Sequence, residues 1–223
     1  MKVLMKKNDL LIFGTGTLAE IAGYYFNTDS SFRVIGFVDK PEFAEKKSTL
    51  MDLPIISWEK DLDQYSKSDV SFFIANGYQK TNSVRQENYE QIKKKGYNCA
   101  SYISTRAIVM TKDIGENCFI LENNVLQPFT KIGNNVTMWS GNHLGHHSVV
   151  EDHSFITSQT VISGKCKIGR NSFLGVNSCL HDGVEIGEKS IVGAGSIVTK
   201  SCKPRSVFLP KKTESRIITR DVI

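Results

Sequence analysis

An aliphatic residue recurs at every sixth position through the second half of this chain, without interruption. The sixteen positions are Ile108, Ile114, Ile120, Leu126, Ile132, Met138, Leu144, Val150, Ile156, Ile162, Ile168, Leu174, Leu180, Ile186, Val192 and Val198. A period of six fits neither the 3.6-residue turn of a helix nor the two-residue alternation of a single strand. It indicates a parallel β-helix, in which three hexapeptides form one triangular coil of about 18 residues. The array therefore predicts about five stacked coils.

The strands of such a coil alternate their side chains, so the residue before each aliphatic position points outward. Outward residues one coil apart should stack in three columns: Phe119, Thr137, Phe155, Phe173 and Ile191; Val125, His143, Val161, Cys179 and Ile197; Lys131, Val149, Lys167 and Glu185. The first two columns are largely apolar, and a monomer rarely leaves contiguous apolar columns in water. We therefore expect other copies of the chain to cover both faces. The alternative is that the N-terminal domain folds over one of them.

Small residues dominate the inward position two residues before each aliphatic residue, where a narrow core has room for one large side chain per corner. Cys118 and Cys166 occupy this position, so we interpret them as packing residues rather than as zinc ligands or disulfide partners. Glycine directly follows the aliphatic residue at seven positions, Gly145 and Gly175 among them. There it suits a tight bend, or a backbone conformation that costs other residues free energy.

The N-terminal third begins with a βαβ pattern. An apolar strand at 9–13 leads into Gly14-Thr15-Gly16, a helical pattern covers 18–26, and a second strand at 32–38 ends at Asp39. Glycines let backbone N–H groups approach a ligand, and a helix N-terminus favours phosphate. Before the repeats, the sequence predicts only two further strands, at 54–57 and 70–75, and two helices, at 59–65 and 81–95. The domain therefore has room for one mononucleotide-binding unit and not for two. We expect Gly14, Thr15, Gly16 and Asp39 to bind a nucleotide-linked small molecule; a dinucleotide cofactor and a purely structural turn are the alternatives.

Three of the five histidines stand close together at His143, His146 and His147. Imidazole titrates near neutral pH and suits general-base work on an amine or a hydroxyl. His143 lies in an apolar outward column and the other two at the next corner, which is consistent with a base at a seam between subunits. A zinc site and simple polar corner residues are the alternatives, because zinc needs three or four converging ligands. We interpret His153, beside two acidic residues, as a solvated corner.

The composition is that of an ordinary globular protein, with 40% hydrophobic residues, 23% charged residues and a formal net charge of +5. No apolar run of about 18 residues indicates a membrane span, and the N-terminal segment lacks a signal-peptide core, so we expect a cytoplasmic protein. Nothing resembles a nucleic-acid-binding motif. Basic residues near the end of the chain suit either a solvated tail or attraction of an anionic ligand: Lys200, Lys203, Arg205, Lys211, Lys212, Arg216 and Arg220.

A small nucleotide-binding domain followed by a hexapeptide array resembles the sugar acyltransferases of the sialic acid O-acetyltransferase and nucleotide-amino-sugar N-acetyltransferase type. The resemblance covers nearly the whole chain. It implies a left-handed β-helix, a homotrimer and acetyl-CoA as co-substrate. The segment from Gly145 to Val150 matches the place where these enzymes keep the catalytic histidine, which puts that role on His146. Relatives often carry an acidic residue directly after it, where this chain has His147.

The same resemblance implies where the ligands bind. Gly14, Gly16 and Asp39 match the family's nucleotide-binding turn and the acidic residue that follows it. The family binds coenzyme A in the groove between adjacent β-helices. This makes four residues neighbours of the pantetheine arm: Gly164, Gly175, Gly193 and Ala194.

Together these observations predict an α/β, Rossmann-like nucleotide-sugar-binding domain over residues 1–104 and a left-handed β-helix acyltransferase domain over 105–223. The predicted activity is acetyl-CoA-dependent N-acetylation of a nucleotide-linked amino sugar. His146 is the expected general base, and a backbone N–H near Gly164 the expected oxyanion donor. If substitution of His143 lowers turnover more than substitution of His146 does, His143 is the base. The alternatives are sialic acid-type sugar O-acetylation and a non-enzymatic β-helix scaffold or nucleotide sensor.

Overall fold

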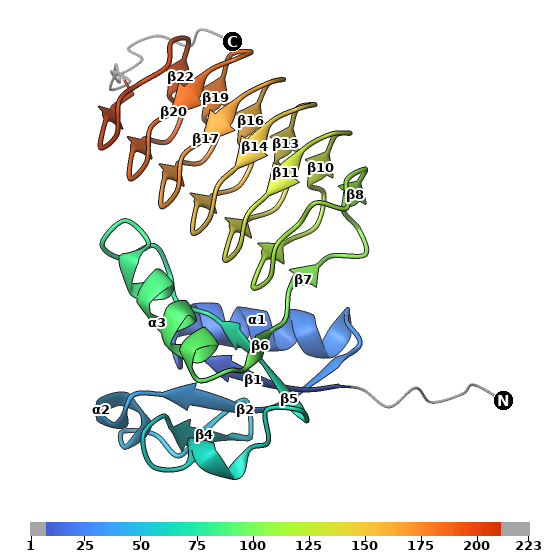
Figure 1. The fold of residues 1–223 in the computed structure, drawn as a ribbon, viewed down its shortest axis with the longest axis vertical. Helices are drawn as coiled ribbons and strands as arrows, with labels where there is room; N and C mark the ends of the chain where they lie inside the picture. Colours follow the sequence, from blue (N-terminus) through green and yellow to red (C-terminus); the bar gives the residue numbers. More distant parts are fainter. Residues whose placement is uncertain (1–7, 211–223) are drawn as a thin grey trace, which may run out of the picture.

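The computed structural model describes residues 8–210, except for the side chain of residue 63. An N-terminal α/β domain lies against one side of a long stack of β-helix coils (Figure 1). Some of the basic residues to which the sequence assigned a tail or an anion-attracting role lie outside the described residues: Lys211, Lys212, Arg216 and Arg220.

A six-stranded sheet forms the centre of the N-terminal domain. The elements in chain order are β1 (Asn8–Phe13), α1 (Thr17–Thr28), β2 (Phe32–Asp39), α2 (Pro41–Ala44), β3 (Thr49–Leu50), β4 (Leu53–Ser57), the 3-10 turn η1 (Leu62–Gln64), β5 (Val70–Ile74), α3 (Ser83–Lys94) and β6 (Asn98–Cys99). The strand order is β3-β4-β2-β1-β5-β6, and only the β3–β4 pair is antiparallel. The chain runs outward from β1 through β2 to β4 on one side and through β5 to β6 on the other. Open sheets of this kind bind ligands at the carboxyl ends of the strands where the order reverses, here between β1 and β5.

Both faces of this sheet are buried, which explains why β1 is a continuous apolar run rather than an alternating one. Helix α1 packs on the face that carries Leu10 and Ile12, and α3 packs on the face that carries Leu11 and Phe13. The predicted helix over 59–65 is wrong, since only η1 forms there. In that segment Leu62 is the one fully buried apolar side chain, too little to hold a longer helix against the sheet.

The β-helix consists of two-residue strands separated by turns. They are β7 (Tyr102–Ile103), β8 (Ile108–Val109), β9 (Phe119–Ile120), β10 (Val125–Leu126), β11 (Lys131–Ile132), β12 (Thr137–Met138), β13 (His143–Leu144), β14 (Val149–Val150), β15 (Phe155–Ile156), β16 (Val161–Ile162), β17 (Lys167–Ile168), β18 (Phe173–Leu174), β19 (Cys179–Leu180), β20 (Glu185–Ile186), β21 (Ile191–Val192), β22 (Ile197–Val198) and β23 (Val207–Phe208). From β9 to β19 each strand pairs in parallel with the third strand after it, so three sheets run along the stack. We name them the covered sheet (β7, β9, β12, β15, β18, β21, β23), the apolar sheet (β8, β10, β13, β16, β19, β22) and the charged sheet (β11, β14, β17, β20).

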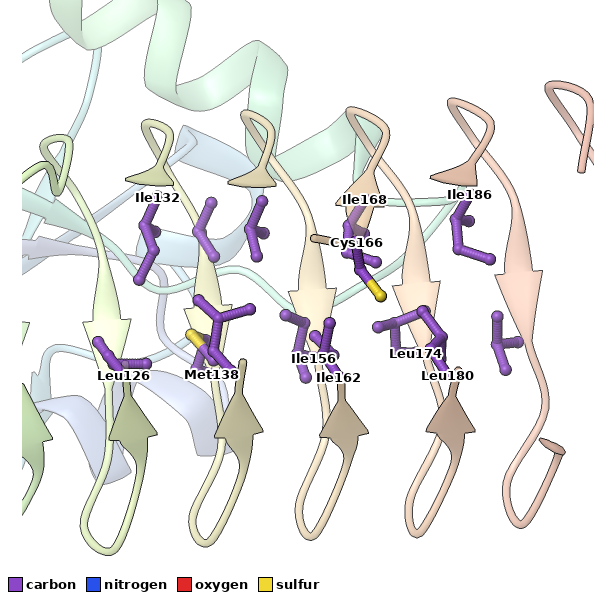
Figure 2. Close-up of a cluster of buried hydrophobic side chains, with 14 of the residues drawn as sticks. Leu126, Ile132, Met138, Ile156, Ile162, Cys166, Ile168, Leu174, Leu180 and Ile186 are labelled. Atoms are coloured by element: carbon purple, nitrogen blue, oxygen red, sulfur yellow. The ribbon is translucent and has the colours of Figure 1, made fainter. Parts of the chain in front are cut away.

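The predicted six-residue phase is confirmed from Ile120 to Val198, where all the aliphatic residues are buried in one continuous core (Figure 2). It is wrong at Ile108, which is 52% exposed. There Leu126 pairs with Val109, and Val109 packs on the core instead. The first coil is thus one residue short, and a shift of one residue exchanges the inward and outward faces of a strand.

The glycines that follow the aliphatic residues are required by close packing between coils and not by backbone conformation. A Cβ built on Gly175 would lie 2.5 Å from the backbone nitrogen of Ala194 in the next coil. The left-handed conformations instead lie two residues further along, at corner residues such as Asn135, His147 and Asn171. Gly175 also opens the turn after β18, since its carbonyl accepts a hydrogen bond from Ser178 N at 3.2 Å. The expected bend is therefore present at Gly175, whereas the expected special backbone conformation is not.

The covered sheet is buried by the protein's own N-terminal domain, which corrects the expectation that other copies cover both apolar faces. Phe155 is 2% exposed and contacts Tyr78 and Arg85 from the segment that leads into and forms α3. The Arg85 guanidinium donates hydrogen bonds to Thr137 Oγ1 and to the carbonyl oxygens of 153 and 154. Among residues 8–210, nothing covers the apolar sheet in this way, since Val161 is 42% and Ile197 70% exposed.

Candidate active site

The histidine corner lies between β13 and β14, where the chain passes from the apolar sheet to the charged sheet. Because a coil has three sides, this corner is opposite the covered sheet on which the N-terminal domain packs. The side chains of His146 and His147 are both exposed. The corner is fixed through its backbone, since His146 N donates to the Gln127 side chain and the His146 carbonyl accepts from Lys165 N, both at 2.8 Å.

The two imidazoles at this corner contact each other directly. Nδ1 of His146 and Nδ1 of His147 are 3.1 Å apart, a hydrogen bond whose donor depends on the tautomers. The His147 ring also packs against Phe129, with 4.8 Å between ring centroids. The sequence placed both histidines at one corner, and the structure brings their rings together.

Gly164 lies one coil beyond His146 and directly beneath its ring. A Cβ added at Gly164 would lie 2.7 Å from Cε1 and 2.8 Å from Nε2 of His146, so only glycine leaves room for this imidazole. The Gly164 N–H donates to Asp182 Oδ1 at 2.9 Å. That N–H is therefore already engaged, which argues against it as a free oxyanion donor.

His143 is separate from this pair. It is the outward residue of β13, half-buried, and pairs with Val125 and Val161 in the neighbouring coils. Within the described part of the chain, no three His, Cys, Asp or Glu side chains converge as metal ligands would.

The other three residues that the resemblance assigns to the pantetheine arm lie at a different corner. Gly175 follows β18, while Gly193 and Ala194 follow β21, where the chain leaves the covered sheet for the apolar sheet. The structure therefore divides the predicted set: Gly164 stands beside His146, and the others border the opposite edge of the apolar sheet. Both corners flank the same exposed face.

His153 is not a solvated corner, which corrects the sequence interpretation. The residue is 3% exposed, and its Nδ1 is 2.9 Å from Nδ2 of Asn135. Its ring meets Tyr89 of α3 edge-on, because this corner lies under the N-terminal domain. Burial lowers the pKa of His153 from 6.5 to about 4, so this imidazole is neutral near pH 7.

The four residues predicted to bind the nucleotide line one pocket of about 480 Å³ in the N-terminal domain. Gly14, Thr15 and Gly16 follow β1, and Asp39 ends β2. Thr15 Oγ1 donates to Asp39 Oδ2 at 2.7 Å, which ties the two segments together. Gly14 has a φ of +124°, a conformation open to glycine but strained for other residues.

The sequence did not single out Lys40, Phe43 and Asn88, which complete the walls of the pocket. Asn76, in the turn after β5, lines the pocket at the ligand end of the sheet, as its place in the sequence predicts. Asn88 Nδ2 donates to Asn76 Oδ1 at 2.8 Å, so α3 reaches the pocket rim. The position of Lys40, directly after Asp39 at the end of a strand, was a readable signal. The position of Asn88 at the pocket could not be read from the sequence, since it depends on how α3 packs.

The fold defines a class: a hexapeptide-repeat parallel β-helix preceded by an α/β domain with a pocket at its strand ends. Residues 166–200 match the family described as hexapeptide repeat of succinyl-transferase. No helix in the described residues is long and apolar enough to cross a bilayer.

Curated relatives of the chain include acyltransferases. UDP-3-O-acylglucosamine N-acyltransferase 2 of Sulfurimonas denitrificans is 31% identical over 93 residues, which are 40% of this chain and 28% of that protein. Galactoside O-acetyltransferase of Escherichia coli K12 is 36% identical over 76 residues, or 34% of each chain. The chain spans about a third or less of the length of these relatives.

Solved structures with the same fold cover nearly the whole chain. Perosamine N-acetyltransferase from Caulobacter crescentus, crystallised as a variant with CoA and GDP-perosamine, superposes with a TM-score of 0.79 at 21% identity, covering 94% of this chain and 98% of that one. The acetyltransferase domain of PglB from Neisseria gonorrhoeae gives 0.76 at 18% identity, covering 87% and 93%. The resemblance to hexapeptide-repeat sugar acyltransferases is confirmed at the level of repeat family, fold and acyltransferase relatives.

Proposed function

We propose that this protein is an acetyl-CoA-dependent N-acetyltransferase that acts on the amino group of a nucleotide-linked amino sugar. The observation that carries the proposal is the imidazole of His146, exposed at a β-helix corner with its Nε2 edge over Gly164. The perosamine enzyme that shares the fold was crystallised with CoA and a GDP-linked amino sugar. A general base next to a donor groove is what transfer to an amine requires.

The N-terminal pocket is suited to the nucleotide. It lies at the carboxyl ends of β1, β2 and β5, where the strand order reverses, and α1 begins at its edge after Gly16. Backbone N–H groups at the start of α1 favour phosphate oxygens. The Asp39 carboxylate is available to accept hydrogen bonds from ribose hydroxyls, as acidic residues at this position of Rossmann-like units do.

Acetyl-CoA fits the exposed apolar sheet. Gly164 at one edge and Gly175, Gly193 and Ala194 at the other border a face with Val161 and Ile197 exposed. An apolar wall of this kind suits a pantetheine arm that runs between two left-handed β-helices.

The site needs a second copy of the chain. His146 lies on the corner opposite the covered sheet, whereas the nucleotide pocket belongs to the domain that packs on that sheet. A sugar held in the pocket of one chain therefore meets the histidine of another more readily than its own. Burial of the apolar sheet between copies would bring these parts together, and the family resemblance supports a homotrimer as the assembly.

His146 acts as the base in the proposed reaction. The sugar amine attacks the thioester carbonyl, and Nε2 of His146 accepts the proton that the amine loses. The C–S bond then breaks, and the leaving thiolate takes the proton back from Nε2 of the His146 imidazolium, which gives the amide, free coenzyme A and the neutral base. General-base help of this kind contributes about 10²- to 10⁴-fold, and orientation of the two substrates supplies much of the rest.

The test is thiol release from acetyl-CoA with a panel of UDP-, GDP- and dTDP-linked amino sugars beside free sialic acid. Turnover on a nucleotide-linked amine, lost in His146→Ala while coenzyme A still binds, is the expected result. Turnover on sialic acid alone would replace the proposal with O-acetylation. If no member of the panel gives thiol release and coenzyme A does not bind, a scaffold or nucleotide sensor would be favoured.

A further inference from the structure

The hydrogen bond between the two corner histidines constrains their protons. Nδ1 of His146 and Nδ1 of His147 are 3.1 Å apart, with the ring planes at 86°. A hydrogen bond between two imidazole nitrogens requires one to carry the proton and the other to present its lone pair. The contact therefore links the tautomer of His146 to that of His147.

The surroundings of His146 decide which ring donates. Its Cε1–Nε2 edge lies over Gly164, on the side where the proposed reaction takes place. A base at Nε2 must keep that nitrogen free of its proton, so the neutral ring carries its proton on Nδ1 and donates it to His147. His147 then accepts at Nδ1 and carries its own proton on Nε2.

His147 is held in a position to do this. Its backbone has a φ of +59°, and its N–H donates to the Pro128 carbonyl at 3.3 Å. Its ring packs on Phe129 at 4.8 Å, with 35° between the ring planes. An exposed side chain that is fixed at both backbone and ring presents Nδ1 in one direction.

We propose that His147 is the positioning residue of the site: it holds His146 in the tautomer with Nε2 free and stabilises the imidazolium that forms. This inference rests on the proposed function. When Nε2 of His146 takes the proton, its Nδ1–H becomes part of a cation, and charge-assisted hydrogen bonds are roughly twice as strong as neutral ones. The His147 side chain thereby stabilises the cation without itself being a carboxylate.

A histidine partner, unlike a carboxylate, has a consequence for the pH dependence of the rate. Two charged residues of the following coils border this corner: Asp182, whose Oδ1 accepts from the Gly164 N–H, and Lys165, whose backbone N–H donates to the His146 carbonyl. The preceding coil presents Gln127, Pro128 and Phe129, none of which titrates. A carboxylate at position 147 would favour the protonated form of His146. On acidification, the free base would therefore be lost at a higher pH.

The first experiment compares pH–rate profiles, using acetyl-CoA and the amino sugar of highest turnover in the panel. His147→Ala is expected to lower kcat about 10- to 100-fold, the range seen when a partner that orients a functional histidine is lost, with both KM values unchanged. His147→Glu is expected to restore kcat and to move the acid limb to higher pH. Asp182→Asn, which keeps an acceptor for the Gly164 N–H, is the control for the neighbouring charge. An unchanged kcat in His147→Ala, or a Glu variant with an unmoved acid limb, would overturn the proposal.

The second experiment needs no turnover. Ring ¹⁵N chemical shifts of the full-length protein at neutral pH should report His146 protonated on Nδ1, and His147→Ala should abolish that preference. A preference that survives in His147→Ala refutes the role of His147. If instead His146→Ala keeps full turnover, the proposed base is wrong, yet the tautomer measurement still decides whether the pair exists.

Discussion

Substitution of Gly164 by alanine tests the position of His146 without touching the histidine itself. The new Cβ would lie 2.7 Å from Cε1 of His146, while ordinary contacts begin at 3.4 Å, so the imidazole must retreat by about 0.7 Å. The nearest atoms are all side-chain atoms, of His146 and of Asp182, and an exposed ring yields at little cost in stability. A misplacement of about 1 Å at a catalytic group lowers a rate by about 10²-fold. We expect kcat to fall about 10- to 100-fold, with the free energy of unfolding changed by less than about 1 kcal/mol.

Gly169→Ala is the matched control, because it makes a similar close contact at another corner. Its Cβ would lie 2.6 Å from the backbone nitrogen of Glu188, which cannot swing aside. Overpacking of this kind costs about 1–3 kcal/mol, so this variant should unfold at lower urea while keeping its kcat. The assays are thiol release at saturating substrates and urea unfolding. A Gly164→Ala protein with wild-type kcat would refute the assignment of His146, since the base would have moved without effect.

Three further predictions concern other parts of the molecule. Asp39→Ala removes the carboxylate that accepts the hydrogen bond of Thr15. We expect KM for the nucleotide sugar to rise about 10- to 100-fold while KM for acetyl-CoA stays constant. Equal changes in both KM values would contradict the pocket assignment. Burial lowers the pKa of His153 from 6.5 to about 4, so the unfolded chain binds this proton more readily between those values. Stability should be full above pH 6.5 and fall by up to about 3 kcal/mol toward pH 4, and urea unfolding of His153→Gln should lack this decline. Val161→Glu puts a charge on the exposed apolar sheet and should yield a monomer in sedimentation velocity, and an intact oligomer would show that this face is not the interface.

The candidate sites were predicted from the sequence to unequal extents. The glycine turn and Asp39 were readable, because a βαβ unit brings the ends of neighbouring parallel strands to one edge. The contact between Gly164 and His146 was partly readable, since residues one coil apart stack. The His146–His147 pairing was not, because it depends on two side-chain torsions and on the ring of Phe129. The close approach of the next coil to the corner glycines was not readable, since sequence spacing does not reveal that distance.

The sequence by itself determined the β-helix, because a repeat of six leaves each coil a single way to bury its aliphatic residues from Ile120 to Val198. It also determined the N-terminal strands and the turn after β1. Only the tertiary structure decided what covers each outer face. The columns of Phe155 and Val161 are both apolar in the sequence, yet α3 and the segment before it bury the first and leave the second exposed. The difference arises from how the N-terminal domain packs on the β-helix, through Arg85 and its neighbours, and no local pattern records that choice.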